Sequence, residues 1–208
     1  MAHIKIPIEI EPIYIALVTD VERLHVKWNM YCQLYVSGEE IVDLLNSSAG
    51  GFFGVCQDIW GGDIISTISR LTDPGQMGRG KNKKDNLSLE KLVKSIDGVK
   101  FPELKDEIGR LLTDSESKCR SIRMFRHKCL GHNDLSTRLQ GKANPLPVPT
   151  REEVEDALES IREVMNSIPR FFGNSHLATV NYGCTSPPYD GKALIARLLE
   201  AKRAKGQS

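Results

Sequence analysis

Residues 104–129, LKDEIGRLLTDSESKCRSIRMFRHKC, carry the helical pattern on which the predicted fold rests. At about 100° per residue, the apolar side chains of this stretch fall within one arc of a helix surface. Pro102 suits the first turn of such a helix, and Gly131 suits its end. The pattern predicts one long helix whose apolar arc faces the core through Leu104, Ile108, Leu111, Leu112, Cys119, Ile122, Phe125 and Cys129.

The segments on either side of this stretch also show helical spacing. We expect helices over residues 13–36 and 52–71, separated by a shorter helix that ends before Gly50 and Gly51. Capping motifs predict further helix starts at Ser37 with Glu40, at Ser88, and at Thr150 with Glu153, and a terminal helix runs through Leu194, Ile195, Leu198 and Leu199. No strands alternate with these helices, so the sequence predicts an all-α bundle with extra C-terminal helices.

Two segments fall outside the helical pattern. Residues 1–12 alternate isoleucine with polar residues and proline, which predicts a short strand or an extended N-terminal arm rather than a helix. Residues 73–86, DPGQMGRGKNKKDN, predict a flexible basic loop. We therefore expect one helical domain over residues 13–203, followed by a tail at 204–208.

Composition excludes several classes of protein. The 28 Lys and Arg residues nearly cancel the 27 Asp and Glu residues, so the chain is not a general polycation and any basic site must be local. No apolar run approaches the roughly 20 residues that span a bilayer. The five cysteines are scattered without a C-x-x-C pair, which favours a reducing compartment, and we expect a cytoplasmic protein.

Arg126 breaks the apolar pattern of the long helix. On the helical wheel Arg120, Arg123 and His127 take solvent positions, whereas Arg126 lands about 40° from Ile122, inside the apolar arc. A buried guanidinium must be paired or line a polar cavity, so both a structural ion pair and a functional site stay open. For Arg120, Arg123 and Lys128 the ordinary alternative is that they complement the dipole at a helix end.

His132 follows Arg126 at a distance that one straight helix does not bridge. The two would lie about 120° apart around the axis and about 9 Å apart along it. Either the chain turns back after Gly131, or a second copy of the motif completes the site across a two-fold axis. Asp134, two residues further on, could orient a histidine.

Two other motifs are discounted. Gly75 to Asn82 fits G-x-x-x-x-G-K, but it lacks the Ser or Thr that reaches magnesium, and a helix rather than a strand is expected before it. Cys129 and His132, with His127 near, lack the second pair of ligands that a zinc site needs. We therefore predict neither a cofactor nor a metal.

The stretch RHKCLGHND, residues 126–134, resembles the R-[N/D/H]-x(3-5)-H motif of HEPN domains, in the form found in their abortive-infection (Abi) U-like branch. The resemblance spans roughly residues 15–140. It includes YCQLY at 31–35, the segment 46–53, SRLTDP at 69–74 and NLSLEKL at 86–92. His127 stands where Asn is commonest, and Gly131 stands where Ala is usual.

The resemblance implies an up-and-down helical bundle of HEPN type that forms a homodimer and cleaves RNA without a metal. In such an enzyme Arg126 and His132 would be the catalytic residues, with His132 as general acid or base and Arg126 neutralising charge on the phosphate. RNA-binding or supporting residues would be Arg120, Arg123, His127, Lys128 and Asp134.

The role that this resemblance implies is a toxin-type effector of phage defence, and it leaves open a cognate antitoxin protein as partner. The alternative hypothesis is a HEPN module without catalysis that binds a nucleotide, RNA or a protein. A purely structural helical adaptor is the third hypothesis.

Overall fold

The computed structural model describes residues 6–78, 80, 83–131, 148–173 and 190–206, and within these ranges the chain is almost entirely helical. The all-α prediction is therefore confirmed. The chain divides into two compact units. The first unit comprises Met1–Val21 with Ile65–Asn181, and the second comprises Glu22–Ile64 with Tyr182–Ser208.

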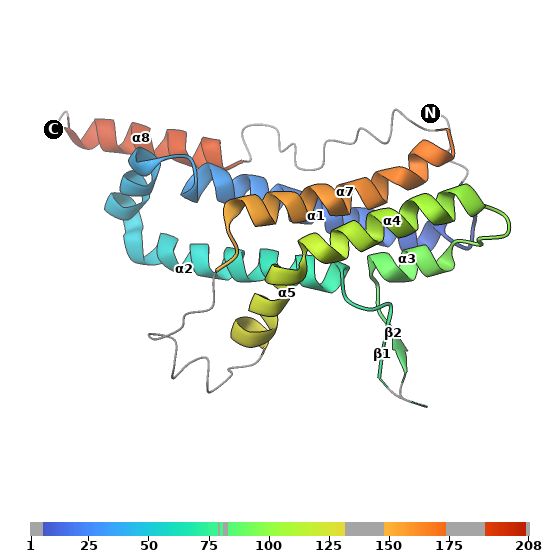
Figure 1. The fold of residues 1–208 in the computed structure, drawn as a ribbon. Coiled ribbons are helices and arrows are strands. Elements are labelled where there is room, and N and C mark those ends of the chain that lie inside the picture. Colours follow the sequence, from blue (N-terminus) through green and yellow to red (C-terminus); the bar gives the residue numbers. More distant parts are fainter. Residues whose placement is uncertain (1–5, 79, 81–82, 132–147, 174–189, 207–208) are drawn as a thin grey trace. The chain divides into compact units, whose positions relative to one another are not determined.

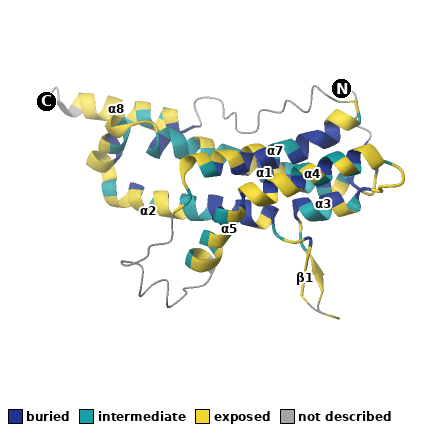
Figure 2. Ribbon diagram, in the orientation of Figure 1, coloured by how far each residue is buried: buried dark blue, intermediate teal, exposed yellow. Residues whose placement is uncertain are grey.

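Helices α4 (Pro102–Lys118) and α7 (Arg151–Phe171) form the centre of the first unit and lie side by side (Figure 1). Their facing sides are buried, whereas their outer sides are exposed (Figure 2). Burial of such apolar faces is the main favourable contribution to folding. The buried residues of the two helices include Leu104, Ile108, Leu112, Val154, Ala157, Leu158, Ile161, Val164, Met165 and Ile168.

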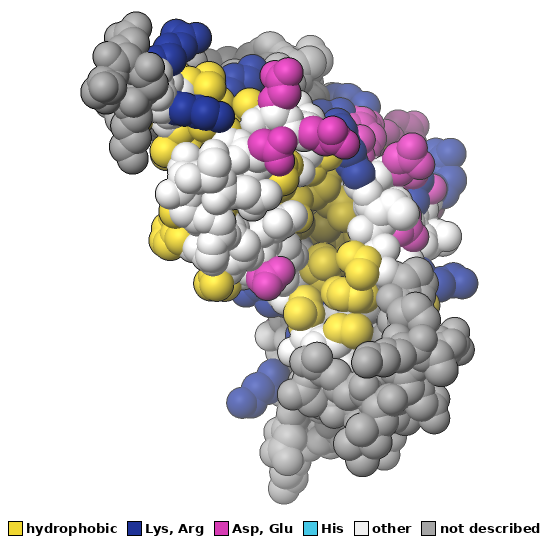
Figure 3. All heavy atoms as spheres, turned by 90° about the vertical axis from the view of Figure 1, so that its left-hand side faces the viewer, with side chains coloured by type: hydrophobic (Ala, Val, Ile, Leu, Met, Phe, Trp, Pro, Cys, Tyr) yellow, Lys and Arg dark blue, Asp and Glu magenta, His cyan; other side chains and the backbone are white. Residues whose placement is uncertain are grey.

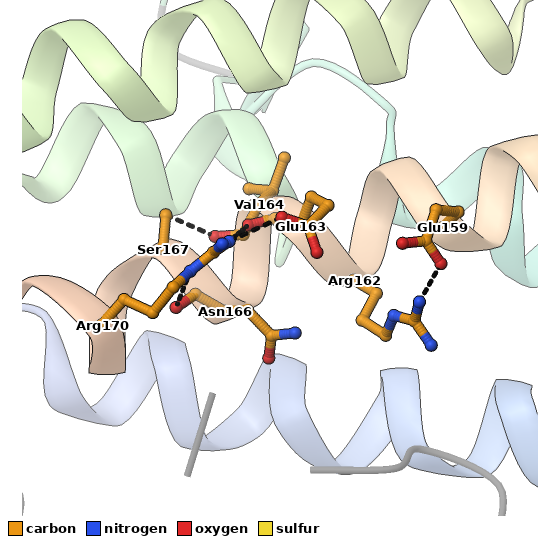
Figure 4. Close-up of polar contacts among 7 residues, drawn as sticks. All are labelled: Glu159, Arg162, Glu163, Val164, Asn166, Ser167 and Arg170. Atoms are coloured by element: carbon orange, nitrogen blue, oxygen red, sulfur yellow. Dashed lines mark hydrogen bonds and ion pairs between the residues drawn. The ribbon is translucent and has the colours of Figure 1, made fainter. Parts of the chain in front are cut away.

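One polar contact lies inside this apolar interface. The Ser160 hydroxyl of α7 is 3.2 Å from the Ser115 hydroxyl of α4, and both side chains are buried. On the other side of α7, Arg162 pairs with Glu159, and Arg170 pairs with Glu163 at 2.6 Å (Figure 4). These exposed pairs contribute little to stability, so burial carries the interface.

The start of α7 follows the predicted capping box. The Thr150 hydroxyl accepts a hydrogen bond from the Glu153 N–H at 3.2 Å, and the Glu153 carboxylate accepts one from the Thr150 N–H at 2.8 Å. The pKa of Glu153 lies below its usual value, mainly because of this backbone N–H and secondarily because the Ser121 hydroxyl donates to the same carboxylate. The capping box thereby links α7 to the next element after α4, which contains Ser121.

Helix α3 (Leu89–Ser95) packs against α4 and begins at Ser88, whose hydroxyl accepts from the Lys91 N–H, as predicted. The segment before it differs from the flexible loop expected at 73–86. Strands β1 (Gln76–Met77) and β2 (Lys84–Asp85) pair antiparallel and form a short hairpin beside the helices (Figure 1). The charged and polar composition suggested a loop, but backbone pairing gives this segment regular structure.

Helix α1 (Glu11–Tyr35) begins earlier than expected. Pro12, which we assigned to an extended arm, lies in the first helical turn, where a missing N–H leaves no hydrogen bond unmade. The preceding residues form a turn in which the Ile10 and Glu11 N–H groups donate to the Pro7 carbonyl. Ile10 is buried, so this segment belongs to the core of the first unit.

Helix α2 (Glu39–Leu71) contains a kink at Ala49, whose φ of −162° and ψ of 62° are not helical. The break expected at Gly50 and Gly51 is thus confirmed to within a residue. The predicted capping role of Ser37 is wrong, because its hydroxyl donates back to the Cys32 carbonyl at 2.8 Å. The first turn of α2 instead uses the Gly38 carbonyl as acceptor.

The second unit has a small core of its own, formed by Leu34, Leu45 and Phe53. Helix α8 (Gly191–Gly206) contributes Ile195 and Leu198 to it, and the Gln33 side chain binds both Asp190 and the Gly191 N–H at the start of α8. Hydrophobic side chains also remain at the surface, as the space-filling view shows (Figure 3). Those on α2 include Phe52, Val55 and Ile59.

In the described ranges, no helix combines the length and the apolar character that crossing a membrane requires.

We predict that Glu153→Gln is less stable than the wild type at pH 7, because glutamine keeps a hydrogen-bond acceptor but loses the charge. A carboxylate whose pKa is lowered by folding stabilises the folded state above its unfolded pKa, which is about 4.3 for Glu. That contribution disappears as the pH falls through the lower, folded pKa. Urea unfolding from pH 7 to pH 3 should therefore show the difference between the two proteins shrinking toward zero.

Glu152→Gln provides the control, because Glu152 occupies the same turn without a hydrogen bond or ion pair recorded for it in the described part of the chain. An equal and pH-independent effect of both substitutions would contradict the role assigned to the capping box.

We predict that Cys119 resists thiol reagents in the native protein. Its side chain is fully buried, and burial raises the pKa of the thiol to about 11, against weaker lowering by hydrogen bonds with Ser115 and Thr72. The thiolate is the reactive form, so alkylation at pH 8 should reach Cys119 only after denaturant is added. Peptide mass spectrometry measures this against half-buried Cys56, and equal native labelling of both would contradict it.

Candidate functional site

The motif-bearing stretch is not one continuous α-helix, as the sequence pattern predicted. Helix α4 ends at Lys118, and Cys119, with φ of −85° and ψ of 0°, separates it from α5 (Arg120–Phe125). The chain leaves the direction of α4 at this point (Figure 1). Residues Arg126–Gly131 then form a π-helical turn, η2, in place of an α-helical end. Such turns are rare and occur frequently at functional sites.

Burial explains why the chain turns at Cys119 and why α5 is held there. Cys119 and Ile122 are both fully buried, and α5 packs against α7. The hydrogen bond between Ser121 and Glu153 joins the same two helices. The apolar residues predicted to face the core are therefore buried up to Ile122, whereas Phe125 and Cys129 are only half-buried.

A cavity of about 640 Å³ lies where α4, α5 and η2 meet the end of α2. Four cationic or titratable side chains of the motif line it: Arg120, Arg123, Arg126 and His127. We call it the arginine cavity. The structure thus brings together four of the residues singled out in the sequence, although they lay on different sides of the helical wheel. The break at Cys119 and the π-helical turn account for the difference, because a wheel assumes a constant 100° per residue.

The side chains of the motif differ in their exposure. Arg120 and His127 are exposed, as predicted. Arg123, predicted to face solvent, is half-buried, and its Nη2 lies 3.8 Å from Oδ1 of Asp73. Arg126, expected on the apolar side, is also half-buried, and within the described ranges no carboxylate lies at ion-pair distance from it. Arg126 therefore satisfies the second of the two open alternatives, since it lines a polar cavity.

The remaining lining residues escaped the sequence analysis. Asp73 and Glu116 add two carboxylates, and the others are Ser69, Thr113, Ser117 and Met124. A signal for two of them was present, because Ser69 and Asp73 belong to the SRLTDP segment on which the family resemblance partly rested. The expected patch of five basic residues without an acid therefore receives acids from other segments, and the arginine cavity is mixed in charge.

The chemistry available in the arginine cavity is anion binding. Its three guanidinium groups exceed its two carboxylates in number, and Asp73 already contacts Arg123. Guanidinium groups bind phosphate or carboxylate through paired, charge-assisted hydrogen bonds, and they keep their charge at all physiological pH values. In the part of the chain that the structure describes, His, Cys, Asp and Glu side chains do not cluster as a metal ion would require.

Three predicted site residues are not part of this cavity as described. Lys128 is exposed and does not line it. His132 and Asp134 lie outside the described residues, so their predicted roles stay predictions.

The glycine-rich segment around Gly75 has a different use from phosphate binding. The Gly75 N–H donates to the Glu90 carboxylate, and the pKa of that carboxyl is lowered first by Lys94 and then by this N–H. A side chain at position 75 would meet the Lys91 backbone at 3.0 Å, so the close approach requires glycine. An N–H committed to a carboxylate is not available to a phosphate, in keeping with the discounted nucleotide-binding motif.

Comparison with known proteins gives one match. The family model HEPN_AbiU2, described as AbiU2, matches residues 8–184. No curated protein and no solved structure matches the chain. The family match covers most of the 208 residues, including both α4 and α7 and the motif between them. The chain therefore belongs to the AbiU2 family of HEPN domains.

Proposed function

We propose that this protein is a metal-independent endoribonuclease and that the arginine cavity holds the phosphate at which RNA is cut. The observation that carries the proposal is the convergence of Arg120, Arg123 and Arg126 with His127 on one cavity, at a π-helical turn of the family motif. Sequence-independent binding of RNA relies on such groups, because the phosphate backbone supplies most of the attraction.

The reaction requires no group beyond these side chains and His132. The ribose 2′-OH attacks the neighbouring phosphorus, a general base takes its proton, and the 5′-oxygen leaves with a proton from a general acid. The products are a 2′,3′-cyclic phosphate and a 5′-hydroxyl. Imidazole titrates near physiological pH, which suits His132 to either proton transfer. Arg126 would stabilise the charge that grows on the phosphoryl oxygens.

A homodimer fits the proposal, because one straight helix separates Arg126 from His132 by about 120° and about 9 Å. Two copies related by a two-fold axis would place Arg126 of one subunit against His132 of the other. Membership of the AbiU2 family supports a biological role as a toxin-type effector of phage defence, held in check by a cognate antitoxin.

We predict that the protein cleaves single-stranded RNA in the presence of EDTA and leaves the DNA copy intact, since DNA lacks the attacking 2′-OH. Arg126→Ala should lower the cleavage rate about 10²- to 10³-fold and His132→Ala about 10²- to 10⁴-fold. Arg110→Ala is the matched control, because Arg110 is exposed on α4 and does not line the arginine cavity.

Denaturing gels with mass spectrometry of the product ends measure this outcome. Wild-type inactivity on varied RNAs, with RNA binding retained, would favour the alternative of a binding module without catalysis. Unchanged cleavage by both variants would exclude the proposed site.

We predict that mixing the two inactive variants restores cleavage if the site is shared between subunits. In a heterodimer of Arg126→Ala and His132→Ala, one of the two composite sites keeps both native residues, and the other keeps neither. The mixture, after partial unfolding and reassociation, should regain a substantial fraction of wild-type activity. Light scattering checks that a dimer forms, and a fully inactive heterodimer would show that each site lies within one subunit.

A further inference from the structure

A second cavity, of about 330 Å³, lies next to the arginine cavity within the first unit. Asp73 lines both cavities, so the two are neighbours that share one wall. Its other polar lining residues are Asp20, Thr67, Arg70 and Asn86, and its apolar ones are Leu71, Met77 and Leu87. These residues come from α1, the end of α2, β1 and the segment before α3.

The hydrogen-bonding groups of this second cavity are mainly acceptors. Asp20 is half-buried, and no cation of the described residues lies within ion-pair distance of its carboxylate. Asp73 contacts Arg123 through Oδ1 alone, at 3.8 Å. The Asn86 side-chain amide donates to the Pro74 carbonyl at 2.8 Å, which leaves its oxygen as an acceptor. Ionised carboxylates only accept, so a complementary ligand must present N–H or O–H donors.

The walls of the second cavity suit a flat ligand. The Arg70 guanidinium donates to the Thr67 hydroxyl at 3.1 Å, which fixes one end of a planar group that stacks well on aromatic rings. Met77 and Leu87 keep 57% and 44% of their surface exposed, large fractions for apolar side chains beside a cavity. A planar ring system covering them would remove that surface from water.

We propose that this second cavity binds the nucleobase next to the phosphate held by the arginines, and that it selects guanine. The proposal rests on the proposed RNA function and adds a base preference to it. Guanine presents two adjacent donors, N1–H and the N2 amino group, which one carboxylate accepts side by side. Adenine and cytosine present a donor beside an acceptor, and uracil presents a donor between two acceptors, so each places an acceptor against a carboxylate. The cavity volume lies in the range of about 300–1,000 Å³ typical of small-ligand sites.

The test measures binding rather than cleavage, with RNA that cannot react. Fluorescein-labelled, 2′-O-methylated hexamers UUUGUU, UUUAUU and UUUUUU are titrated with the full chain, and fluorescence anisotropy gives the dissociation constants. The wild type should bind UUUGUU about tenfold more tightly than the other two, the discrimination expected of one paired hydrogen-bond contact to a base edge.

The variant Asp20→Asn replaces one acceptor oxygen by a donor, so it should lower the affinity for UUUGUU to that for UUUUUU. Asp106→Asn, an exposed carboxylate on α4 that lines neither cavity, should keep the tenfold preference. Met77→Ala, at an exposed position, should weaken the preference without removing an acid, and thermal unfolding checks that each variant is folded. Arg126→Ala should weaken the binding of all three hexamers by the same factor.

The outcomes separate this proposal from the one on which it rests. Equal wild-type affinity for the three hexamers, or a guanine preference retained by folded Asp20→Asn, would overturn the guanine site and leave the phosphate site in place. Failure of the wild type to bind any hexamer would overturn both. A guanine preference lost only in Asp20→Asn and Met77→Ala supports the second cavity even where the wild type cleaves nothing.

Discussion

The packing of α4 against α7 is the interaction on which the rest of the first unit depends. The buried faces of these helices supply most of its apolar core, and Ser115 and Ser160 satisfy each other inside it. Because α7 lies beside both α4 and α5, it fixes the place at which the chain turns. The contact between Glu153 and Ser121 then ties the start of α7 to the helix that carries Arg120 and Arg123. Core packing, capping and cavity are thus consecutive parts of one arrangement.

The sequence was informative where a local rule decides the structure. Capping at Ser88 and at Thr150 with Glu153, the start at Pro102 and the burial of Leu104, Ile108 and Ile122 all follow from short-range patterns. The family could also be identified, because RHKCLGHND and SRLTDP are contiguous segments. Arg126 stood out for the same reason, since it interrupts a periodic pattern.

The features that escaped the sequence depend on contacts between distant segments. The break at Cys119 arises because Cys119 and Ile122 are both drawn into the core beside α7, which a wheel of constant angle does not represent. Asp73 reaches Arg123 across a separation of 50 residues, so no spacing rule links them. Ser37 has the pattern of a capping residue but bonds to Cys32, because the preceding helix offered its carbonyl first. The pairing of β1 with β2 was hidden by a composition typical of loops.

The π-helical turn at Arg126–Gly131 changes what an insertion or a deletion means in this motif. A π turn closes its hydrogen bonds over five residues rather than four, so it contains one residue more than the α-helical path it replaces. Removing one residue between positions 126 and 131 would return the chain to an α-helix and rotate everything after it by about 100°. The number of residues in the motif is therefore structural information of the same rank as their identity. Within the family, motif spacing should be compared together with the local helix type, because equal spacing in an α-helix and a π-helix aims the following side chains in different directions.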